Sequence, residues 1–142
     1  MSAGVPTVWL GLLAYLRKTG ETIDSLKRII VGGAACPLAI MHEMDKHGVE
    51  SRVGWGMTEM SPLGTVNHPK EKHLDFSPAD LLQVRLKQGR PPYGVEMMIV
   101  DDSGNELPRD GKAFGDLLVR GPWITSGYFK GEGGEVLRDI AG

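Results

Sequence analysis

The residue types best suited to chemistry stand together in one short stretch, GWGMTE at residues 54–59. Trp55 offers a flat aromatic face on which a planar ring can stack. Thr58 offers a hydroxyl for a phosphate-type oxygen, and the carboxylate of Glu59 is a ligand that Mg²⁺ accepts beside nucleotide phosphates. The stretch therefore predicts ring stacking, phosphate contact and metal binding from a single turn.

A second stretch, GGAA at residues 32–35, presents a backbone surface without bulky side chains. A flat ring can lie against such a surface, so a planar group such as adenine would fit between this turn and Trp55. The glycines at positions 54 and 56 leave space for that ring.

Both stretches also have a purely structural interpretation. A tryptophan beside glycines is common in core packing, and a Thr-Glu pair after a strand is typical of a helix N-cap followed by a favourable acidic residue in the first turn. The GGAA stretch can equally be a tight connection between a strand and a helix. From the residue types alone, both interpretations stay open.

The elements around these stretches place them at one edge of a sheet. Residues 5–18 have the apolar spacing of a helix, with proline near the start and glycine after the end. Residues 26–55 predict a strand, a helix that begins at Pro37, and a second strand, which is the pattern of a parallel crossover. Because the strands of such a unit end at the same edge, GGAA and GWGMTE are expected to face one another.

The second half of the chain has a different character. Residues 63–76 predict a polar loop, and a short helix follows with Ser77 as its N-cap and Gly89 after its end. Residues 95–101 and 115–121 are strand-like and are separated by a segment dense in turn residues.

These elements predict an α/β fold: a partial parallel sheet with crossover helices, followed by a small antiparallel β subdomain that resembles a distorted barrel. Residues 1–88 are expected to form the α/β part, and residues 89–142 the β-rich part. The boundary lies at residues 88–92, QGRPP.

Composition narrows the classes of partner. A formal net charge of −2 argues against a nucleic-acid partner, which needs a basic surface. No apolar run reaches the roughly 18 residues that a transmembrane helix needs, and no basic region marks the N-terminal run as a signal peptide. Cys36 is the one cysteine, so a reducing, cytoplasmic location is expected.

The remaining titratable side chains predict no metal centre of their own. His42 and His47 are five positions apart, which does not place them on one helix face, and no cysteine pair accompanies the histidines. Cys36 has no partner base in view and is expected to fill a small space in the core.

Four segments together resemble one family. GWGMTEMSP resembles the aromatic-Gly-x-Thr-Glu signature of the adenylate-forming (AMP-binding) superfamily, which contains the acyl-CoA synthetases. VPTVWLGLL and LKRIIVGGAACP resemble the preceding segments of fatty-acid-type ligases, and GRPPYGVEMMIVDDSGNELPRDGKAFGDLLVRGPWITSGYF resembles the following block. The segments occur in family order and cover the chain from about residue 5 to residue 130.

The resemblance implies roles for the residues of both turns. Trp55 would stack on adenine, with Gly33 and Ala34 on the opposite face. Thr58 would contact the AMP phosphate and Glu59 would hold Mg²⁺, so these two are the implied catalytic residues.

Other positions receive weaker assignments. Gly56 and Met57 belong to the implied nucleotide-binding turn and, with Gly32, would border an acyl channel. Trp9 is a candidate for the gate or wall of that channel. The β subdomain's glycines and tyrosine are expected to serve its fold and not the chemistry: Gly121, Gly127 and Tyr128.

The implied activity is that of an ATP-dependent acyl-CoA ligase. Such an enzyme activates a fatty or related carboxylic acid as acyl-AMP, using ATP and Mg²⁺, and transfers the acyl group to coenzyme A. Medium to long or modified acyl chains are expected.

Several parts of that family pattern are missing from this sequence. They are the phosphate loop ending in Pro-Lys-Gly, the ribose-binding Asp and the C-terminal lid domain with its catalytic Lys. The chain is therefore expected to be a central piece of a synthetase, with little activity alone because no lysine stabilises the developing charge.

Two alternatives remain open. The first is an adenylation domain that loads a carrier protein. The second is an inactive piece with only a binding or structural role, whose exposed sheet edges and apolar faces would favour a homo-oligomer.

Overall fold

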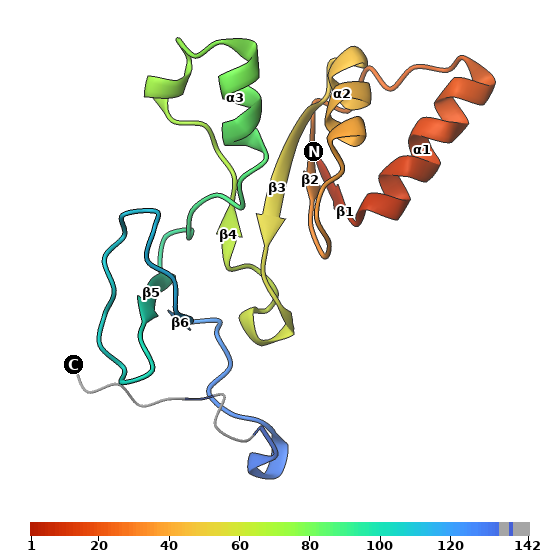
Figure 1. Cartoon of the computed structure of the whole chain (residues 1–142). Coiled ribbons are helices and arrows are strands. Elements are labelled where there is room, and N and C mark those ends of the chain that lie inside the picture. The colour runs from red at the N-terminus through yellow and green to blue at the C-terminus, as the bar shows by residue number, and fades with distance from the viewer. Residues whose placement is uncertain (134–136, 138–142) are drawn as a thin grey trace.

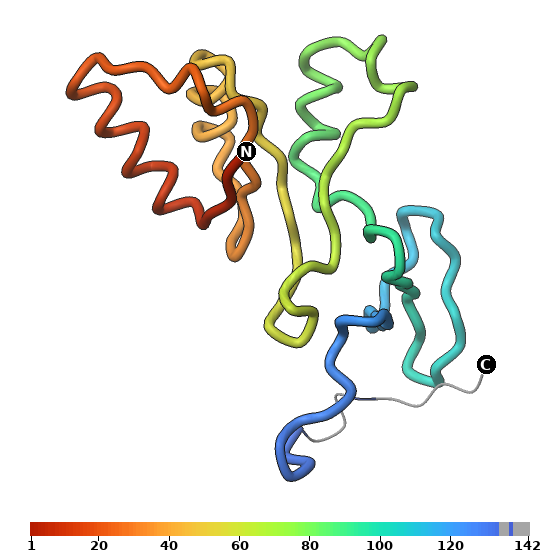
Figure 2. Tube along the Cα trace, turned by 180° about the vertical axis from the view of Figure 1, so that it is seen from behind, coloured from red at the N-terminus to blue at the C-terminus, as the bar shows by residue number. Residues whose placement is uncertain are grey.

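The computed structural model describes residues 1–133 and residue 137. Figure 1 shows helices α1 (Pro6–Thr19) and α2 (Leu38–Lys46) beside strands β1 (Ser2–Gly4), β2 (Arg28–Val31) and β3 (Glu50–Trp55). Helix α3 (Pro78–Arg85) lies next to them, and the strand pair β5 (Glu96–Val100) and β6 (Asp116–Arg120) comes farther along the chain. The same arrangement is seen from behind in Figure 2.

The α-helices of the described residues begin and end at local signals, and α1 and α2 also bury an apolar face, which α3 does not. Helix α1 spans Pro6–Thr19 and ends at Gly20, whose φ of 72° lets its N–H donate to the carbonyl of Leu16. Helix α2 spans Leu38–Lys46, and α3 spans Pro78–Arg85 with the Ser77 side chain accepting from the N–H of Asp80. Pro37 is the N-cap of α2 and not its first helical residue, because its ψ of 135° is still extended.

The main sheet has the strand order β1-β2-β3-β4. Strands β1 (Ser2–Gly4), β2 (Arg28–Val31) and β3 (Glu50–Trp55) run parallel, and β4 (Thr65–Val66) pairs antiparallel with β3. Within the described residues, short 3₁₀ turns complete the connections at Thr58–Met60, Glu71–His73 and Phe129–Gly131.

The core lies between the sheet and helices α1 and α2. Its side chains alternate along β2, where Ile29 and Val31 are fully buried toward the helices. The other members of this cluster come from the helices and the start of β3: Trp9, Leu13, Ile40, Met44 and Val49. Burial of each large apolar side chain stabilises the fold by roughly 1.5–3 kcal/mol, so this layer carries most of the packing energy.

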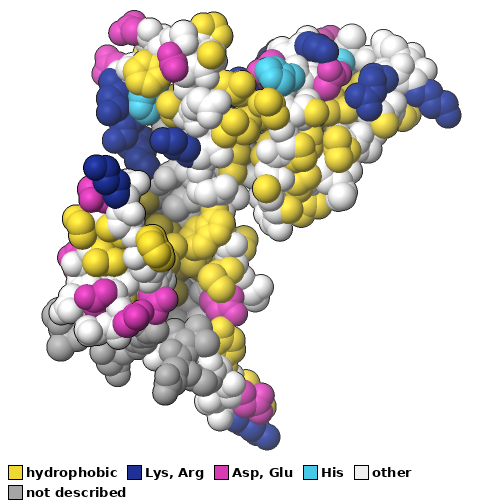
Figure 3. Space-filling model, in the orientation of Figure 1, with side chains coloured by type: hydrophobic (Ala, Val, Ile, Leu, Met, Phe, Trp, Pro, Cys, Tyr) yellow, Lys and Arg dark blue, Asp and Glu magenta, His cyan; other side chains and the backbone are white. Residues whose placement is uncertain are grey.

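The second sheet is smaller and more exposed. Strand β5 (Glu96–Val100) pairs antiparallel with β6 (Asp116–Arg120), and an isolated bridge between Val66 and Arg90 ties the connecting segment to β4. Tyr93 and Phe114 near these strands are almost wholly exposed. Figure 3 shows hydrophobic side chains gathered over the α1 part and Lys and Arg side chains gathered near α3.

The predicted fold class is confirmed: parallel strands with crossover helices precede a small antiparallel sheet. The prediction did not include β1, and it treated the whole of residues 63–76 as loop, whereas Thr65–Val66 forms β4. Both strands are too short to show a period of their own, and they exist because a neighbouring strand offers them partners. Among the described residues, no helix is both long and apolar enough to cross a bilayer.

Candidate functional site

The two predicted turns meet at the carboxyl ends of β2 and β3. Val31 pairs with Val53 in the parallel register, so residues 32–33 continue beside residues 54–55. A Cβ added to Gly32 would lie 3.1 Å from the carbonyl oxygen of Gly54, which shows how closely the two backbones pass. The sheet register thus brings GGAA and GWGMTE to one edge.

The turn after β3 is closed so tightly that it needs glycine at two positions. A Cβ at Gly56 would overlap the carbonyl oxygen of Pro62, and a Cβ at Gly64 would lie 2.7 Å from the sulfur of Met60. The same Cβ would lie 2.8 Å from Cζ3 of Trp55, so Gly64 packs directly on the indole. Gly56 therefore has a backbone reason to be glycine, in addition to the space that it leaves beside Trp55.

The polar pair lies on a 3₁₀ turn anchored by one apolar residue. Met60 is buried, whereas Met57 and Thr58 are exposed and Glu59 is half-buried. The N–H groups of Met60 and Ser61 donate to the carbonyls of Met57 and Thr58, which closes the turn. The Thr58 hydroxyl and the Glu59 carboxylate are therefore held at the surface beside the sheet edge.

Glu59 is fixed by contacts from the far end of the chain. The Tyr128 hydroxyl donates to Oε1 of Glu59 at 2.7 Å, and the N–H of Thr125 donates to the Glu59 carbonyl at 2.7 Å. The hydrogen bond from Tyr128, helped by the backbone N–H of Glu59 itself, holds the pKa of this carboxyl below its usual value. The side chain is thus an ionised carboxylate at neutral pH.

No cation balances this carboxylate within the described part of the chain. The ion pairs found there join other residues, and none includes Glu59. Nor do residues 1–133 and 137 contain a group of three His, Cys, Asp or Glu side chains that could hold a metal by themselves. A lone, ionised carboxylate suits Mg²⁺, which keeps several waters and is bound by one or two carboxylates together with substrate phosphates.

The other predicted residues are spread around this edge. Gly33 and Ala34 lie exposed on the GGAA turn, and Gly33 has a φ of +76°, which favours glycine. Trp9 lies in the core next to this edge: it is 4% exposed and donates from Nε1 to the Gly4 carbonyl at 3.0 Å, the same carbonyl that accepts from the N–H of Gly32. A channel role for Trp9 stays a prediction, as do the nucleotide contacts of the turns.

Tyr128 is the functional candidate that sequence reasoning missed. The resemblance assigned it to the fold of the β subdomain, whereas its hydroxyl contacts Glu59 across 69 positions. Trp123 of the same segment also reaches the turn, where its Nε1 donates to the Leu63 carbonyl at 3.0 Å. No local pattern signals such a pairing, since Glu59 lies on a short 3₁₀ turn and Tyr128 in an irregular segment far along the chain.

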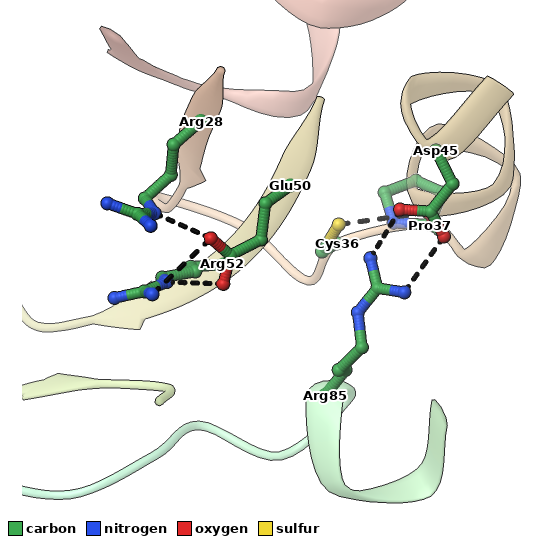
Figure 4. A network of polar contacts seen from close by, with 7 residues as sticks. All are labelled: Arg28, Cys36, Pro37, Asp45, Glu50, Arg52 and Arg85. Carbon is green, nitrogen blue, oxygen red and sulfur yellow. Dashed lines mark hydrogen bonds and ion pairs between the residues drawn. The ribbon is translucent and has the colours of Figure 1, made fainter. Parts of the chain in front are cut away.

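The amino end of β3 is built differently, as Figure 4 shows. Glu50 accepts from Arg28 at 2.7 Å and from Arg52 at 2.8 Å, and Arg85 forms a two-pronged pair with Asp45 at 2.8 Å. Partial burial opposes ionisation of Glu50, but the hydrogen bonds from Arg52 and Arg28 outweigh it and lower the pKa of this carboxyl. Each of these carboxylates therefore has its own guanidinium.

A cavity of about 370 Å³ lies at this amino end and not at the predicted site. Residues of α2, β3 and α3 line it, and the buried Ser51 Oγ has no hydrogen-bond partner among them. Its charged walls are already paired with one another. The cavity therefore lies between α2, β3 and α3, and no residue of the turn that carries Glu59 lines it.

Comparison with known proteins gives one consistent result. The profile of the family described as AMP-binding enzyme matches residues 1–129. The chain is 50% identical over 140 residues to the 3-methylmercaptopropionyl-CoA ligase of Ruegeria pomeroyi, covering 98% of this chain and 26% of that protein. It is 49% identical, with the same two coverages, to the medium-chain-fatty-acid–CoA ligase of Ectopseudomonas oleovorans.

Solved structures agree with this result. A long-chain-fatty-acid-CoA ligase from Archaeoglobus fulgidus matches with a TM-score of 0.71 at 26% identity, covering 91% of this chain and 26% of that one. The o-succinylbenzoate coenzyme A synthetase from Bacillus subtilis, solved with ATP and magnesium ion, shares the fold with a TM-score of 0.66 at 24% identity, covering 89% of this chain and 24% of that one. The chain spans about a quarter of the length of the curated relatives it matches.

Proposed function

Because this chain belongs to the family of AMP-binding enzymes, we propose that it forms the nucleotide- and metal-binding edge of an ATP-dependent acyl-CoA ligase. One observation carries the proposal. Glu59 is an ionised carboxylate without a cationic partner among the described residues, and it stands beside the exposed Thr58 where two parallel strands end. That position is where open α/β sheets bind their ligands.

In the proposed site, adenine lies between two surfaces at this edge. The indole of Trp55 forms one surface, and the backbone of Gly64 packs against that ring. Gly33 and Ala34 form the other surface, where the backbone is exposed. Gly56 and Met57 complete the turn that borders the nucleotide.

The polar residues act on the phosphates. The Thr58 hydroxyl donates to a phosphate oxygen, and Glu59 holds the Mg²⁺ that accompanies ATP. When bound, that ion supplies positive charge that offsets the charge developing on the phosphate oxygens. The contribution of this chain is to keep the Glu59 carboxylate fixed before the substrate arrives, so that little reorganisation is needed.

The proposed reaction has two steps. The substrate carboxylate attacks the α-phosphorus of ATP, which forms acyl-AMP and releases pyrophosphate. The thiol of coenzyme A then attacks the acyl carbonyl and displaces AMP. The acyl chain is proposed to leave the site past Gly32 and the Gly56-Met57 turn, with Trp9 as an outer wall.

The substrate is proposed to be a carboxylic acid with an unbranched apolar chain. Relatives that share about half of their aligned residues with this chain are named for a thioether-containing acid and for medium-chain fatty acids. We therefore place 3-methylmercaptopropionate and medium-chain fatty acids first in a panel of acids.

The test uses the extended protein, meaning this chain together with the coding sequence on either side of it. Pyrophosphate release is measured across the panel, and formation of the acyl-CoA product is followed in parallel. Glu59→Gln is expected to lower the rate by at least about tenfold, since a ligand of the metal loses its charge. Glu50→Gln is the matched control, because it neutralises a carboxylate at the other end of β3.

The outcomes separate the alternatives. Acyl transfer to a phosphopantetheinyl carrier protein but not to free coenzyme A would replace the ligase by a carrier-loading enzyme. Absence of pyrophosphate release with every acid would contradict the enzymatic proposal and leave a binding or structural role. Equal rates for Glu59→Gln and Glu50→Gln would show that Glu59 does not bind the metal ion.

A further inference from the structure

Tyr128 and Glu59 form a hydrogen bond between two segments that share no element of secondary structure. The tyrosine hydroxyl donates to Oε1 at 2.7 Å across 69 positions. In the same contact, the N–H of Thr125 donates to the Glu59 carbonyl at 2.7 Å. Residues 121–128, which we term the clamp segment, thus hold both the backbone and the side chain of Glu59.

The ring of Tyr128 is held independently of its hydroxyl. A Cβ added at Gly133 would overlap the ring carbons of Tyr128, so the backbone of Gly133 lies directly on the ring. With the Thr125 bond also in place, loss of the hydroxyl alone leaves the clamp segment docked. The hydroxyl can therefore be examined without dismantling its surroundings.

A tyrosine hydroxyl constrains a carboxylate without cancelling its charge. An arginine, as at Glu50, would supply the positive charge itself and leave little attraction for a metal ion. The neutral O–H of Tyr128 instead directs Oε1 while the negative charge of Glu59 remains available. This combination suits a ligand that must be both oriented and charged.

We propose that Tyr128 is a positioning residue, whose hydroxyl keeps the Glu59 carboxylate in the orientation that receives the divalent cation of the nucleotide substrate. The inference rests on the proposed function, because Glu59 is there the metal ligand. Hydrogen-bonded partners orient ligating carboxylates, and their loss costs about tenfold or more in metal affinity. Tyr128 thus joins the β-rich half of the chain to the chemistry at the sheet edge.

The experiment compares Tyr128→Phe with a matched variant, Tyr15→Phe, in the extended protein. Tyr15 donates to both carboxylate oxygens of Glu21 at 3.1 Å, so its variant removes the same kind of bond at the exposed surface of α1. Mn²⁺ is the probe, and its binding in the presence of a non-hydrolysable ATP analogue is measured by electron paramagnetic resonance. Circular dichroism checks that each variant is folded.

Tyr128→Phe is expected to raise the dissociation constant for Mn²⁺ by about tenfold, and Tyr15→Phe to leave it unchanged. Phenylalanine keeps the ring on Gly133, so both variants are expected to melt as the parent does. In turnover assays, the Mg²⁺ concentration for half-maximal rate is expected to rise by a similar factor. A Tyr128→Phe variant that binds Mn²⁺ as tightly as the parent, or more tightly, overturns the inference.

Variants at Glu59 separate this inference from the proposal beneath it. If Glu59→Gln weakens Mn²⁺ binding and Tyr128→Phe does not, the inference fails while the metal site stands. If Glu59→Gln leaves Mn²⁺ binding unchanged, the metal site itself fails. The double variant is expected to bind Mn²⁺ as Glu59→Gln does, and a further tenfold loss would show that Tyr128 acts apart from Glu59.

Discussion

The two ends of β3 hold their carboxylates in different ways. At the amino end, Glu50 sits between Arg28 and Arg52, and Asp45 of α2 pairs with Arg85 of α3. At the carboxyl end, Glu59 receives a hydrogen bond from a neutral hydroxyl and has no ion pair among the described residues. The carboxylates at the amino end of β3 are therefore neutralised by arginines, whereas the Glu59 carboxylate at the other end has no cationic partner among the described residues.

This difference distinguishes a structural carboxylate from one suited to a ligand. Paired charges near the surface contribute little net stability, and here they join β2 to β3 and α2 to α3. A carboxylate that is ordered and yet uncompensated is suited to receive a cation from outside. The cavity at the amino end is lined by charges that are already paired with one another.

The largest effect is expected at the carboxyl end, from Gly56→Ala. The added Cβ would overlap the Pro62 carbonyl oxygen, so the turn must open and displace the residues that follow it. We expect the free energy of unfolding to fall by about 3 kcal/mol, at the upper end for overpacking, together with loss of nucleotide binding. Denaturant unfolding and titration with AMP measure the two effects.

Gly11→Ala is the control for that variant. Gly11 lies inside α1, and a Cβ there would meet nothing within 4 Å. Alanine should therefore stabilise the helix by about 0.5–1 kcal/mol. If Gly56→Ala were as harmless as Gly11→Ala, the close passage of this turn would not constrain position 56.

A smaller, pH-dependent effect is expected at the amino end, from Glu50→Gln. The folded state lowers the pKa of Glu50 from an ordinary value of 4.5, so its contribution is present above that value and disappears as the pH falls through the folded-state value. Because the side chain is 39% exposed, screening limits that contribution to about 0.3 kcal/mol.

Urea unfolding at a series of pH values measures this contribution. The parent and Glu50→Gln should differ at neutral pH and converge as the pH falls through the lowered folded-state pKa of Glu50. If the difference in free energy of unfolding between the two proteins grew in acid, folding would raise the pKa of Glu50 and not lower it.

An effect in the opposite direction, no change or a small stabilisation, is expected at the cavity from Ser51→Ala. The Ser51 hydroxyl is buried without a hydrogen-bond partner, so its removal takes away a desolvation cost and no bond. The free energy of unfolding should stay unchanged or rise by up to about 1 kcal/mol. A loss of more than about 1 kcal/mol, measured by thermal unfolding, would mean that the hydroxyl is bonded within the cavity.

Much of the fold could be predicted because its signals are local. The apolar spacing in α1, the proline and glycine at its ends, and the Ser77 cap all act within a few residues. β1 and β4 were missed because they depend on strands that lie far away in the sequence. Pro37 was placed one position too far into α2, since a proline suits both the N-cap and the first turn.

The candidate site was predictable only in part. The parallel crossover already implied that GGAA and GWGMTE share an edge, and the register of β2 with β3 places them there. The tight passage of Gly56 along Pro62 was not predictable, because it depends on how the loop folds back. The hydrogen bond between Tyr128 and Glu59 could not be predicted for a similar reason, because no sequence pattern near either residue indicates that the two side chains meet.

The position of Cys36 allows local opening of the chain to be measured by thiol labelling. It is the one cysteine, it packs half-buried against the core at the start of α2, and burial raises the pKa of its thiol. Figure 4 shows it beside the contact of α2 with α3. Alkylation needs an accessible thiolate, so the rate at which a maleimide dye labels Cys36 would report how often the contact between α2 and α3 opens. No further cysteine would have to be introduced for this measurement.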